Sequence, residues 1–445
     1  MNLRDVRAAL RAGWLGVAVL LSACGVNASL EGTDESERTT GVTITVDMFN
    51  EPPPKATLAA FTKATGIAVN WVVTDWDSLQ TKILAATKAR RYFADATDVD
   101  WSRVGQLSRL SAFYPMETLI DTKALAEDMP QLTSFTSHGH VIGIPYDAMF
   151  DVLTVNKEMF AAAGVSATPA TMEEYTAALW TIKSKGVAAY PLSIPFAPAE
   201  GLSTYWYQVT AAFGGTVLDE KHKQHFADPA SPGYRAAKWM VDAYRGGLVP
   251  PGNLDLADGQ AQQTVMAKGL AASTFADYSG NIGTLYDVPS ASSVVHKIAY
   301  VATPGTPVNN SIPDGIGVPV HAKYPKAAAR FIEWFTSAGN QADFAGINGV
   351  DKAMPNYSLP SHLSAVRQLA EKGQLIGGAE LATMLKTSSR PIFGTGAPSW
   401  YPHFSAAVYT HLHAAAAGEE SVDTAVRAIA AVADRLSSRV ITVGE

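Results

Sequence analysis

The chain has 445 residues, of which 47% are hydrophobic, and it carries 34 basic against 41 acidic side chains, a formal net charge of −7 at pH 7. This length is more than a single hydrophobic core usually organises, so it predicts two domains or lobes. The acidic balance argues against nucleic acid as a partner, because binding to the phosphate backbone needs an excess of basic side chains.

The N-terminal segment has the pattern of a secretory signal peptide. Three arginines precede an apolar run at residues 12–21 that is too short to span a bilayer comfortably. Residues 21–25 read Leu-Ser-Ala-Cys-Gly, which resembles the bacterial lipobox, where the cysteine is diacylated and becomes the new N-terminus. Cys24 is the only cysteine, which excludes an intramolecular disulfide. The alternative is an ordinary secretory signal with a chance cysteine.

Lipidation of Cys24 would place the protein on the outer face of the cell membrane. Two acyl chains hold a protein stably on a bilayer, whereas one does so only marginally. We therefore expect removal of residues 1–23 and a mature chain that is lipid-anchored on the extracytoplasmic face. Residues 24–41 are small, polar and acidic, which predicts a flexible tether between the lipid and the folded body.

Strand and helix patterns alternate along the rest of the chain. Residues 42–46 and 67–73 alternate as half-buried strands, and Leu58 and Phe61 lie on one face of a helix between them. This βαβ order predicts an α/β fold. Alternation returns after residue 150, where Thr171 and Glu174 form a capping-box pattern.

Several short motifs occur in one order along the chain. They lie at residues 138–146 (His-Gly-His-Val-Ile-Gly-Ile-Pro-Tyr), 152–157 (Val-Leu-Thr-Val-Asn-Lys), 168–174 (Thr-Pro-Ala-Thr-Met-Glu-Glu), 213–217 (Phe-Gly-Gly-Thr-Val), 266–272 (Met-Ala-Lys-Gly-Leu-Ala-Ala) and 314–320 (Asp-Gly-Ile-Gly-Val-Pro-Val). In this order they resemble the signatures of bacterial extracellular solute-binding proteins of ABC sugar importers. The resemblance covers residue 42 to the C-terminus.

The resemblance implies an α/β, two-lobed periplasmic-binding-protein-like fold with hinge-connected lobes and a central ligand cleft. By analogy, lobe 1 comprises residues 42–152 and 299–348, and lobe 2 comprises residues 153–298 and 349–445. The strands that cross between the lobes would then fall near residues 151–155, 297–301 and 346–350.

The resemblance also implies a function in transport without catalysis or a cofactor. The protein would capture a sugar and deliver it to the transmembrane subunits of an ABC permease, acting as a monomer. The narrower similarity is to actinobacterial sugar-import lipoproteins, including the mycobacterial amino-sugar type. An amino sugar, trehalose, a malto-oligosaccharide and a glycerophosphodiester all remain open as ligands.

Five residues of the first lobe match positions at which family members contact sugar. They are Asn50, Glu51, Asp77, Asp100 and Trp101. Each acidic residue also has a structural alternative: Glu51 as a solvated loop charge, Asp77 as a helix N-cap and Asp100 as a strand-end turn residue.

The second lobe offers mainly aromatic candidates. Tyr278 stands where the family often has tryptophan, and core packing is expected to take at least one of the three aromatic residues at 205–207. The candidates are Tyr146, Trp206, Tyr207, Asp277 and Tyr278.

Three further candidates come from the resemblance. Arg390 lies in a Ser-Ser-Arg-Pro segment where relatives use an arginine to grip the ligand through its fork of donors, and Trp400 lies in the same loop region. Gly315 could let a ligand approach backbone amides. The several carboxylates expected in the cleft favour a cationic or amino sugar over an anionic one.

Other chemistries find little support in the residue patterns. His138 and His140 fall in a predicted hairpin turn, and His411 and His413 fall in a predicted helix where i and i+2 diverge, so we expect no metal site. No nucleophile elbow or phosphate-binding loop is present.

Two rival functions stay open on the sequence. An exported glycoside hydrolase is the main alternative, because Glu51, Asp77, Asp100 and Asp277 could supply an acid and a base. A scaffold or adhesin would bind no small ligand.

Overall fold

The computed structural model describes residues 35–345 and 359–441, with side chains up to residue 439. The predicted signal peptide, Cys24, most of the predicted tether and the crossing expected near 346–350 lie outside the described residues. At the start of the described chain, η1 (Glu35–Glu37) forms an ion pair between Glu37 and Lys326. No helix in the described ranges is long and apolar enough to cross a membrane.

The first sheet has the strand order β2 (Ile67–Val73), β1 (Val42–Met48), β3 (Ala96–Asp100), β12 (Asp314–Gly317) and β6 (Ile144–Pro145). β1 pairs parallel with β2 and β3, while β12 runs antiparallel to β3 and β6. Helix α1 (Lys55–Thr65) joins β1 to β2 and buries Phe61 against Phe331 of α10 (Pro325–Phe335), with ring centroids 5.5 Å apart. The βαβ unit predicted from the apolar pattern is therefore confirmed.

The second sheet has the order β10 (Ile298–Val301), β7 (Asp151–Asn156), β9 (Ser273–Tyr278) and β8 (Leu192–Ser193). Helices α6 (Met172–Ser184), α7 (Glu200–Ala212) and α8 (Pro232–Arg245) belong to its hydrophobic core. Thr171 caps α6 by accepting from the backbone N–H of Glu174 at 3.1 Å, and the Glu174 carboxylate accepts from the N–H of Ala170 at 2.8 Å. The predicted capping pattern thus begins the helix, although Glu174 reaches one residue beyond the cap.

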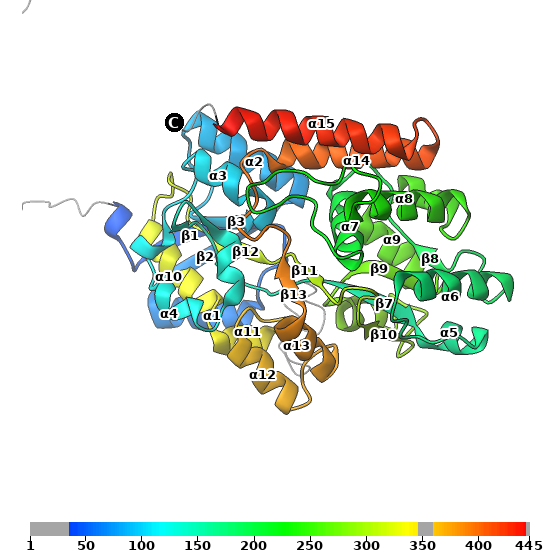
Figure 1. Ribbon diagram of the computed structural model, residues 1–445. Coiled ribbons are helices and arrows are strands. Elements are labelled where there is room, and N and C mark those ends of the chain that lie inside the picture. Colours follow the sequence, from blue (N-terminus) through cyan, green and yellow to red (C-terminus); the bar gives the residue numbers. More distant parts are fainter. Residues whose placement is uncertain (1–34, 346–358, 442–445) are drawn as a thin grey trace, which may run out of the picture. The chain divides into compact units, whose positions relative to one another are not determined.

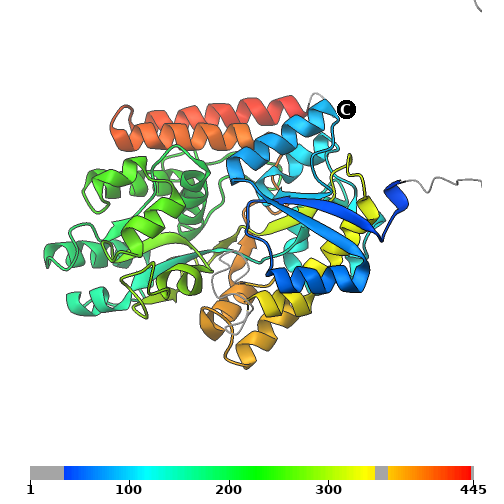
Figure 2. The ribbon, with the colours of Figure 1, turned by 180° about the vertical axis from the view of Figure 1, so that it is seen from behind.

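A helical hairpin ends the described chain. Helices α14 (Tyr401–Ala417) and α15 (Val422–Ile441) pack side by side, and both contact α8 (Figures 1 and 2). Helix α14 also contacts α7 and the short helix η2 (Trp101–Arg103) that follows β3. The hairpin therefore touches elements attached to both sheets.

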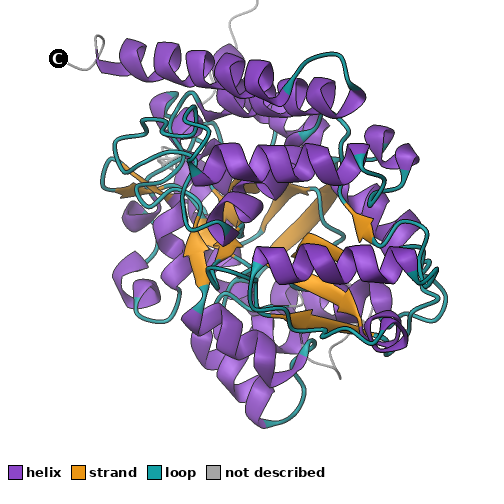
Figure 3. Cartoon of the chain, turned by 45° about the vertical axis from the view of Figure 1, so that its right-hand side comes forward, coloured by secondary structure: helices purple, strands orange, loops and turns teal. Residues whose placement is uncertain are grey.

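The remaining elements cover the sheets or connect them, and Figure 3 shows helices surrounding the strands. The helices are α2 (Trp76–Ala89), α3 (Val104–Arg109), α4 (Thr122–Ala126), α5 (Lys157–Ala163), α9 (Asp258–Ala261), α11 (Ala338–Ala345), α12 (Leu363–Glu371) and α13 (Gly378–Thr387). Two small ribbons pair β4 (Thr136–Ser137) with β5 (His140–Val141) and β11 (Asn309–Ser311) with β13 (Ser389–Pro391). The β4–β5 ribbon confirms the hairpin turn predicted at residues 138–140.

Candidate functional site

A pocket of about 380 Å³ lies where elements of the two sheets meet. Its wall is formed on one side by the end of β3, the start of β12 and the start of α2. The other side is formed by the start of α7, by Asp258 of α9 and by the end of β9. Strand ends and helix starts therefore converge on one cavity, which is where α/β proteins commonly bind ligands.

Aromatic side chains supply much of the pocket wall. Trp76 begins α2, and Trp101 follows β3 with 8% of its surface exposed. Phe49 follows β1, and Tyr278 ends β9 on the opposite side. Flat apolar rings on both sides suit a ligand that has a broad, weakly polar face.

Two carboxylates of the first wall lie side by side on neighbouring strands. Asp100 ends β3 and Asp314 begins β12, and the two are paired in the antiparallel register. Asp100 accepts from the backbone N–H of Ser102 at 2.7 Å and from the indole Nε1–H of Trp76 at 3.2 Å. Asp100 therefore stabilises the turn after β3, as the structural alternative predicted, and it also lines the pocket.

Asp77 lies in the first turn of α2 and is exposed at the pocket. The N-cap of this helix is Asp75, whose carboxylate accepts from the N–H of Ser78 at 3.0 Å. The alternative that Asp77 serves as the N-cap is therefore wrong, because the helix begins one residue before it.

The second wall holds its carboxylates through hydroxyl groups. Glu200, the first residue of α7, accepts from the phenol of Tyr401 and from Ser405 Oγ at 2.9 Å. Asp258 accepts from the phenol of Tyr278. Burial raises the pKa of Glu200, and nearby Arg103 opposes that rise.

A group of buried acids lies behind the first wall. Asp147 accepts from the backbone N–H groups of Asp314 at 3.0 Å and Met149 at 3.3 Å, and burial raises its pKa to about 7. Burial, with the neighbouring Asp100, also raises the pKa of Asp98 well above its usual range. Burial, and next the neighbouring Asp147, raises the pKa of Asp314 well above its usual range. The pocket is therefore backed by a strongly acidic interior.

Four of the residues predicted from the sequence come together in this pocket. They are Asp77, Asp100, Trp101 and Tyr278. The same pocket contains Trp76, Glu200, Asp258 and Asp314, which sequence reasoning missed. Asp314 is the first residue of the 314–320 motif and Trp76 precedes the candidate Asp77, so the sequence contained a signal that could have pointed to each of them as a pocket residue. Glu200 and Asp258 lie at helix starts outside the recognised motifs.

The other first-sheet candidates do not line this pocket. Asn50 donates through Nδ2 to the phenol oxygen of Tyr146 at 2.8 Å, and both residues are buried. Glu51 is exposed. At Gly315 a Cβ atom would lie 2.6 Å from Phe135, so this glycine is required for packing.

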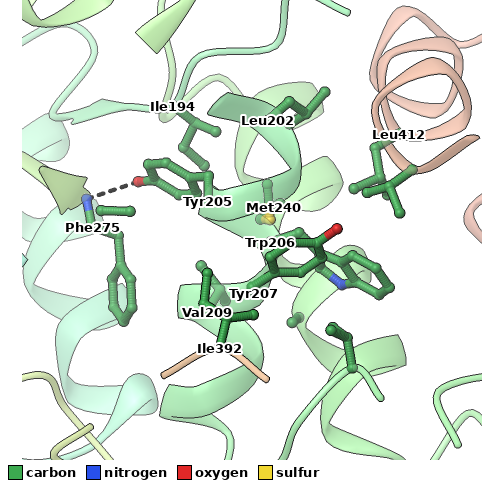
Figure 4. Packing of buried hydrophobic residues seen from close by; sticks show 14 of the residues in the cluster. Ile194, Leu202, Tyr205, Trp206, Tyr207, Val209, Met240, Phe275, Ile392 and Leu412 are labelled. Atoms are coloured by element: carbon green, nitrogen blue, oxygen red, sulfur yellow. Dashed lines mark hydrogen bonds between the residues drawn. The ribbon is translucent and has the colours of Figure 1, made fainter. Parts of the chain in front are cut away.

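The aromatic run of α7 belongs to the core. Tyr205, Trp206 and Tyr207 are all buried, as Figure 4 shows, with Phe275 N–H donating to the phenol of Tyr205 at 2.8 Å. The indole N–H of Trp206 donates to the carbonyl of Gly233 at 2.8 Å. Trp400, 7% exposed, belongs to the same core cluster. All three aromatic residues at 205–207 are therefore core residues.

Asp277 and Arg390 lie elsewhere. Asp277 is buried and accepts from Asn281 Nδ2 and the phenol of Tyr286, each at 2.6 Å, while burial raises its pKa to about 6. Arg390 donates to the carbonyls of Ser389 and Thr387 and lines a separate cavity of about 300 Å³ beside Tyr207.

The histidines and acidic residues do not gather into a metal-binding group in the described part of the chain. Within the described side chains, no group of three histidine, cysteine or acidic residues is arranged to hold a metal ion. His411 Nδ1 faces Glu420 at 2.8 Å, and His413 Nδ1 faces the carbonyl of Phe196 at 2.8 Å. The two rings thus diverge, as their spacing on a helix predicts.

Comparisons with solved structures give similar folds at low identity. Maltose-bound MalE3 of T. maritima is 19% identical, with a TM-score of 0.73 over 89% of this chain and 100% of that one. A solute-binding protein of Agrobacterium radiobacter in complex with ribitol is 20% identical (TM-score 0.74, 89% and 99%). One of Thermotoga lettingae bound with alpha-D-tagatose is 17% identical (TM-score 0.75, 89% and 99%). A comparison with curated protein sequences finds no match.

These similarities confirm the two-lobed, periplasmic-binding-protein-like α/β fold that the motifs implied. The family model described as bacterial extracellular solute-binding protein matches residues 50–342. Because that match spans well over half of the chain, the protein belongs to the bacterial extracellular solute-binding protein family.

Proposed function

We propose that this protein is the substrate-binding lipoprotein of an ABC importer, and that it captures a sugar in the pocket lined by Trp76, Trp101 and Tyr278. The observation that carries the proposal is the combination of aromatic faces with carboxylates in one cavity. Sugar rings stack their C–H faces on aromatic rings, and their hydroxyls donate to carboxylates. The neighbours solved with maltose, ribitol and tagatose support a polyhydroxylated ligand.

The charge of the pocket favours an amino sugar. Five acidic side chains line it: Asp77, Asp100, Glu200, Asp258 and Asp314. No lysine or arginine is among the described residues that line the pocket, and Arg103 beside it pairs with Glu200. Because burial raises the pKa values of Asp314 and Glu200, the preference for an ammonium group over a carboxylate or phosphate rests on Asp77, Asp100 and Asp258.

The proposal extends to location and partners. Cys24 would anchor the chain by lipid to the extracytoplasmic face of the membrane, and residues 24–41 would tether it near the transmembrane subunits of the permease. Tethering raises the effective concentration of a receptor at its partner. The two sheets would then lie in lobes with the boundaries expected from the sequence, and the protein would act as a monomer.

The test is calorimetric titration of the purified mature lipoprotein in detergent with glucosamine, glucose and glucuronate. We expect one-to-one binding, strongest for glucosamine and weakest for glucuronate. The matched control is Lys238→Ala, an exposed ion-pair residue outside the pocket, which should bind as the wild type does. Absence of binding to any polyhydroxylated compound would refute the sugar ligand.

The hydrolase alternative is tested in the same samples. Incubation with aryl glycosides and disaccharides should release no product, because a binding protein returns its ligand unchanged. Sustained turnover that is lost in Asp100→Asn would overturn the transport proposal.

A further inference from the structure

Arg103 and Glu200 face each other beside the pocket, on elements attached to different sheets. Arg103 ends η2, which continues directly from β3 of the first sheet. Glu200 begins α7, which packs on β9 of the second sheet. Among the ion pairs of residues 35–345 and 359–439, this is the only one that includes a side chain lining the pocket.

Each partner is held by different neighbours. The Arg103 guanidinium lies 5.2 Å from the ring centroid of Trp76, whose indole donates to Asp100. Glu200 is held by Tyr401 and Ser405 of α14, a helix that packs on α7 and also contacts η2. A change in the separation of the two sides would therefore change the distance between the charges.

Arg103 and Glu200 form an ion pair without a hydrogen bond between them. Arg103 Nη2 lies 3.8 Å from Glu200 Oε2, beyond hydrogen-bond range, although the two side chains are only 13% and 22% exposed. The Nε–H of Arg103 is buried and has no hydrogen-bond partner among the described residues. The guanidinium can thus gain hydrogen bonds if the walls approach, and in so sheltered a place solvent screens the attraction weakly.

We propose that Arg103 and Glu200 form an electrostatic latch that stabilises the closed arrangement of the pocket, with Arg103 acting as a positioning residue through Glu200 rather than by touching the ligand. The inference rests on the proposed function in that it assumes a pocket that opens and closes around its ligand. A weaker latch lowers the population of the closed state, and the apparent affinity falls by the same fraction.

The test measures closure without any ligand. In a Cys24→Ala background, spin labels at the exposed positions Lys123→Cys on α4 and Glu173→Cys on α6 report the separation of the two sides. Arg103→Met should shift the distance distribution to longer values, and Arg103→Lys should restore part of the shorter population. In 1 M salt, where the Debye length is about 3 Å, the wild type should shift in the same direction and Arg103→Met should change less.

Lys238→Met is the matched control, because it breaks an exposed ion pair with Asp242 within α8, away from the pocket and from the expected crossing strands, and it should leave the distances unchanged. If Arg103→Met fails to fold, as judged by circular dichroism, the salt series on the wild type decides the question. Unchanged distances in Arg103→Met and in high salt would overturn the latch.

Titration with glucosamine separates this inference from the proposed function. We expect Arg103→Met to raise the dissociation constant about tenfold while distances lengthen, as a roughly tenfold smaller closed population would require. Weaker binding with unchanged distances would mean that Arg103 contacts the ligand, and the latch would be wrong. Longer distances in a protein that binds no sugar would uphold the latch and refute the sugar ligand.

Discussion

Two groups of aromatic residues in this molecule look alike in sequence but serve different purposes. Trp206 and Tyr207 on α7 are buried and pack against other rings, with Trp206 5.0 Å from Phe226 between ring centroids. Trp76 and Tyr278 line the pocket and are joined to the carboxylates of Asp100 and Asp258. The two groups differ in their place in the fold, because Trp76 begins α2 and Tyr278 ends β9, whereas Trp206 and Tyr207 lie within α7.

The largest expected effect is on the free energy of unfolding, and it distinguishes the buried rings of α7 from the rings that line the pocket. Trp206→Ala should lower the free energy of unfolding by about 3–5 kcal/mol, because it leaves a cavity and an unpaired carbonyl at Gly233. Urea denaturation followed by tryptophan fluorescence measures this loss. Affinity for glucosamine in the fraction that stays folded should change little; a large loss of affinity would place Trp206 in the binding site.

Trp76→Ala should show the opposite behaviour. The residue is only half-buried, so the free energy of unfolding should fall by less than in Trp206→Ala. The dissociation constant for glucosamine should rise about tenfold, since an aromatic contact contributes about 1.4 kcal/mol and that amount is tenfold in affinity. Calorimetric titration provides the measurement. If Trp76→Ala binds as the wild type does, the pocket is not the sugar site.

A smaller change tests the link between ring and acid. Tyr278→Phe keeps the ring and removes the hydroxyl that donates to Asp258. We expect a threefold to tenfold weaker affinity, in keeping with a net contribution of about 0.7–1.4 kcal/mol from the hydrogen bond that preorganises Asp258. Tyr286→Phe is the matched control, because its hydroxyl donates to Asp277 outside the pocket. Equal effects of both variants on affinity would contradict the assignment.

The buried acids behind the first wall predict a pH dependence of stability. Because the pKa of Asp147 is about 7 in the folded protein and near 3.8 ordinarily, the folded state holds a proton that the unfolded chain releases between those values. The free energy of unfolding should therefore fall as the pH rises from 4 towards 7. Asp277, with a pKa of about 6, contributes with the same sign.

Asp147→Asn should reduce that dependence. The amide oxygen can still accept from the N–H groups of Asp314 and Met149, while the buried charge is gone. The melting temperature of the variant should exceed that of the wild type at pH 8 and approach it at pH 5. Parallel pH profiles for the two proteins would show that Asp147 does not titrate in this range.

The smallest effect on binding is expected at the lipid site. Cys24→Ala should release the protein from the membrane, as followed by fractionation and by detergent partitioning, and it should leave the affinity for glucosamine unchanged. Membrane retention of the variant would refute the lipid anchor, which remains a prediction of the sequence.

The resemblance to the family explains what could be foreseen of the site. Asp100, Trp101 and Tyr278 are candidates because they match positions in relatives, and they lie at or just after the ends of β3 and β9. Glu200 could not be found in this way, because its role depends on Tyr401 and Ser405, which are about two hundred residues away in the chain. The prediction that Trp206 contacts the ligand did not place it in this pocket, because α7 is buried on all sides and its residue types alone do not indicate this.

Periodicity and short motifs along the chain are enough to predict the opening βαβ unit, the family and the candidate lipid site. Which rings and acids share the pocket follows only from the tertiary structure. Contacts such as Arg103 with Glu200, and the register that sets Asp314 beside Asp100, join segments far apart in the chain. Their positions follow from how the two sheets and the helices pack together, which no local pattern specifies.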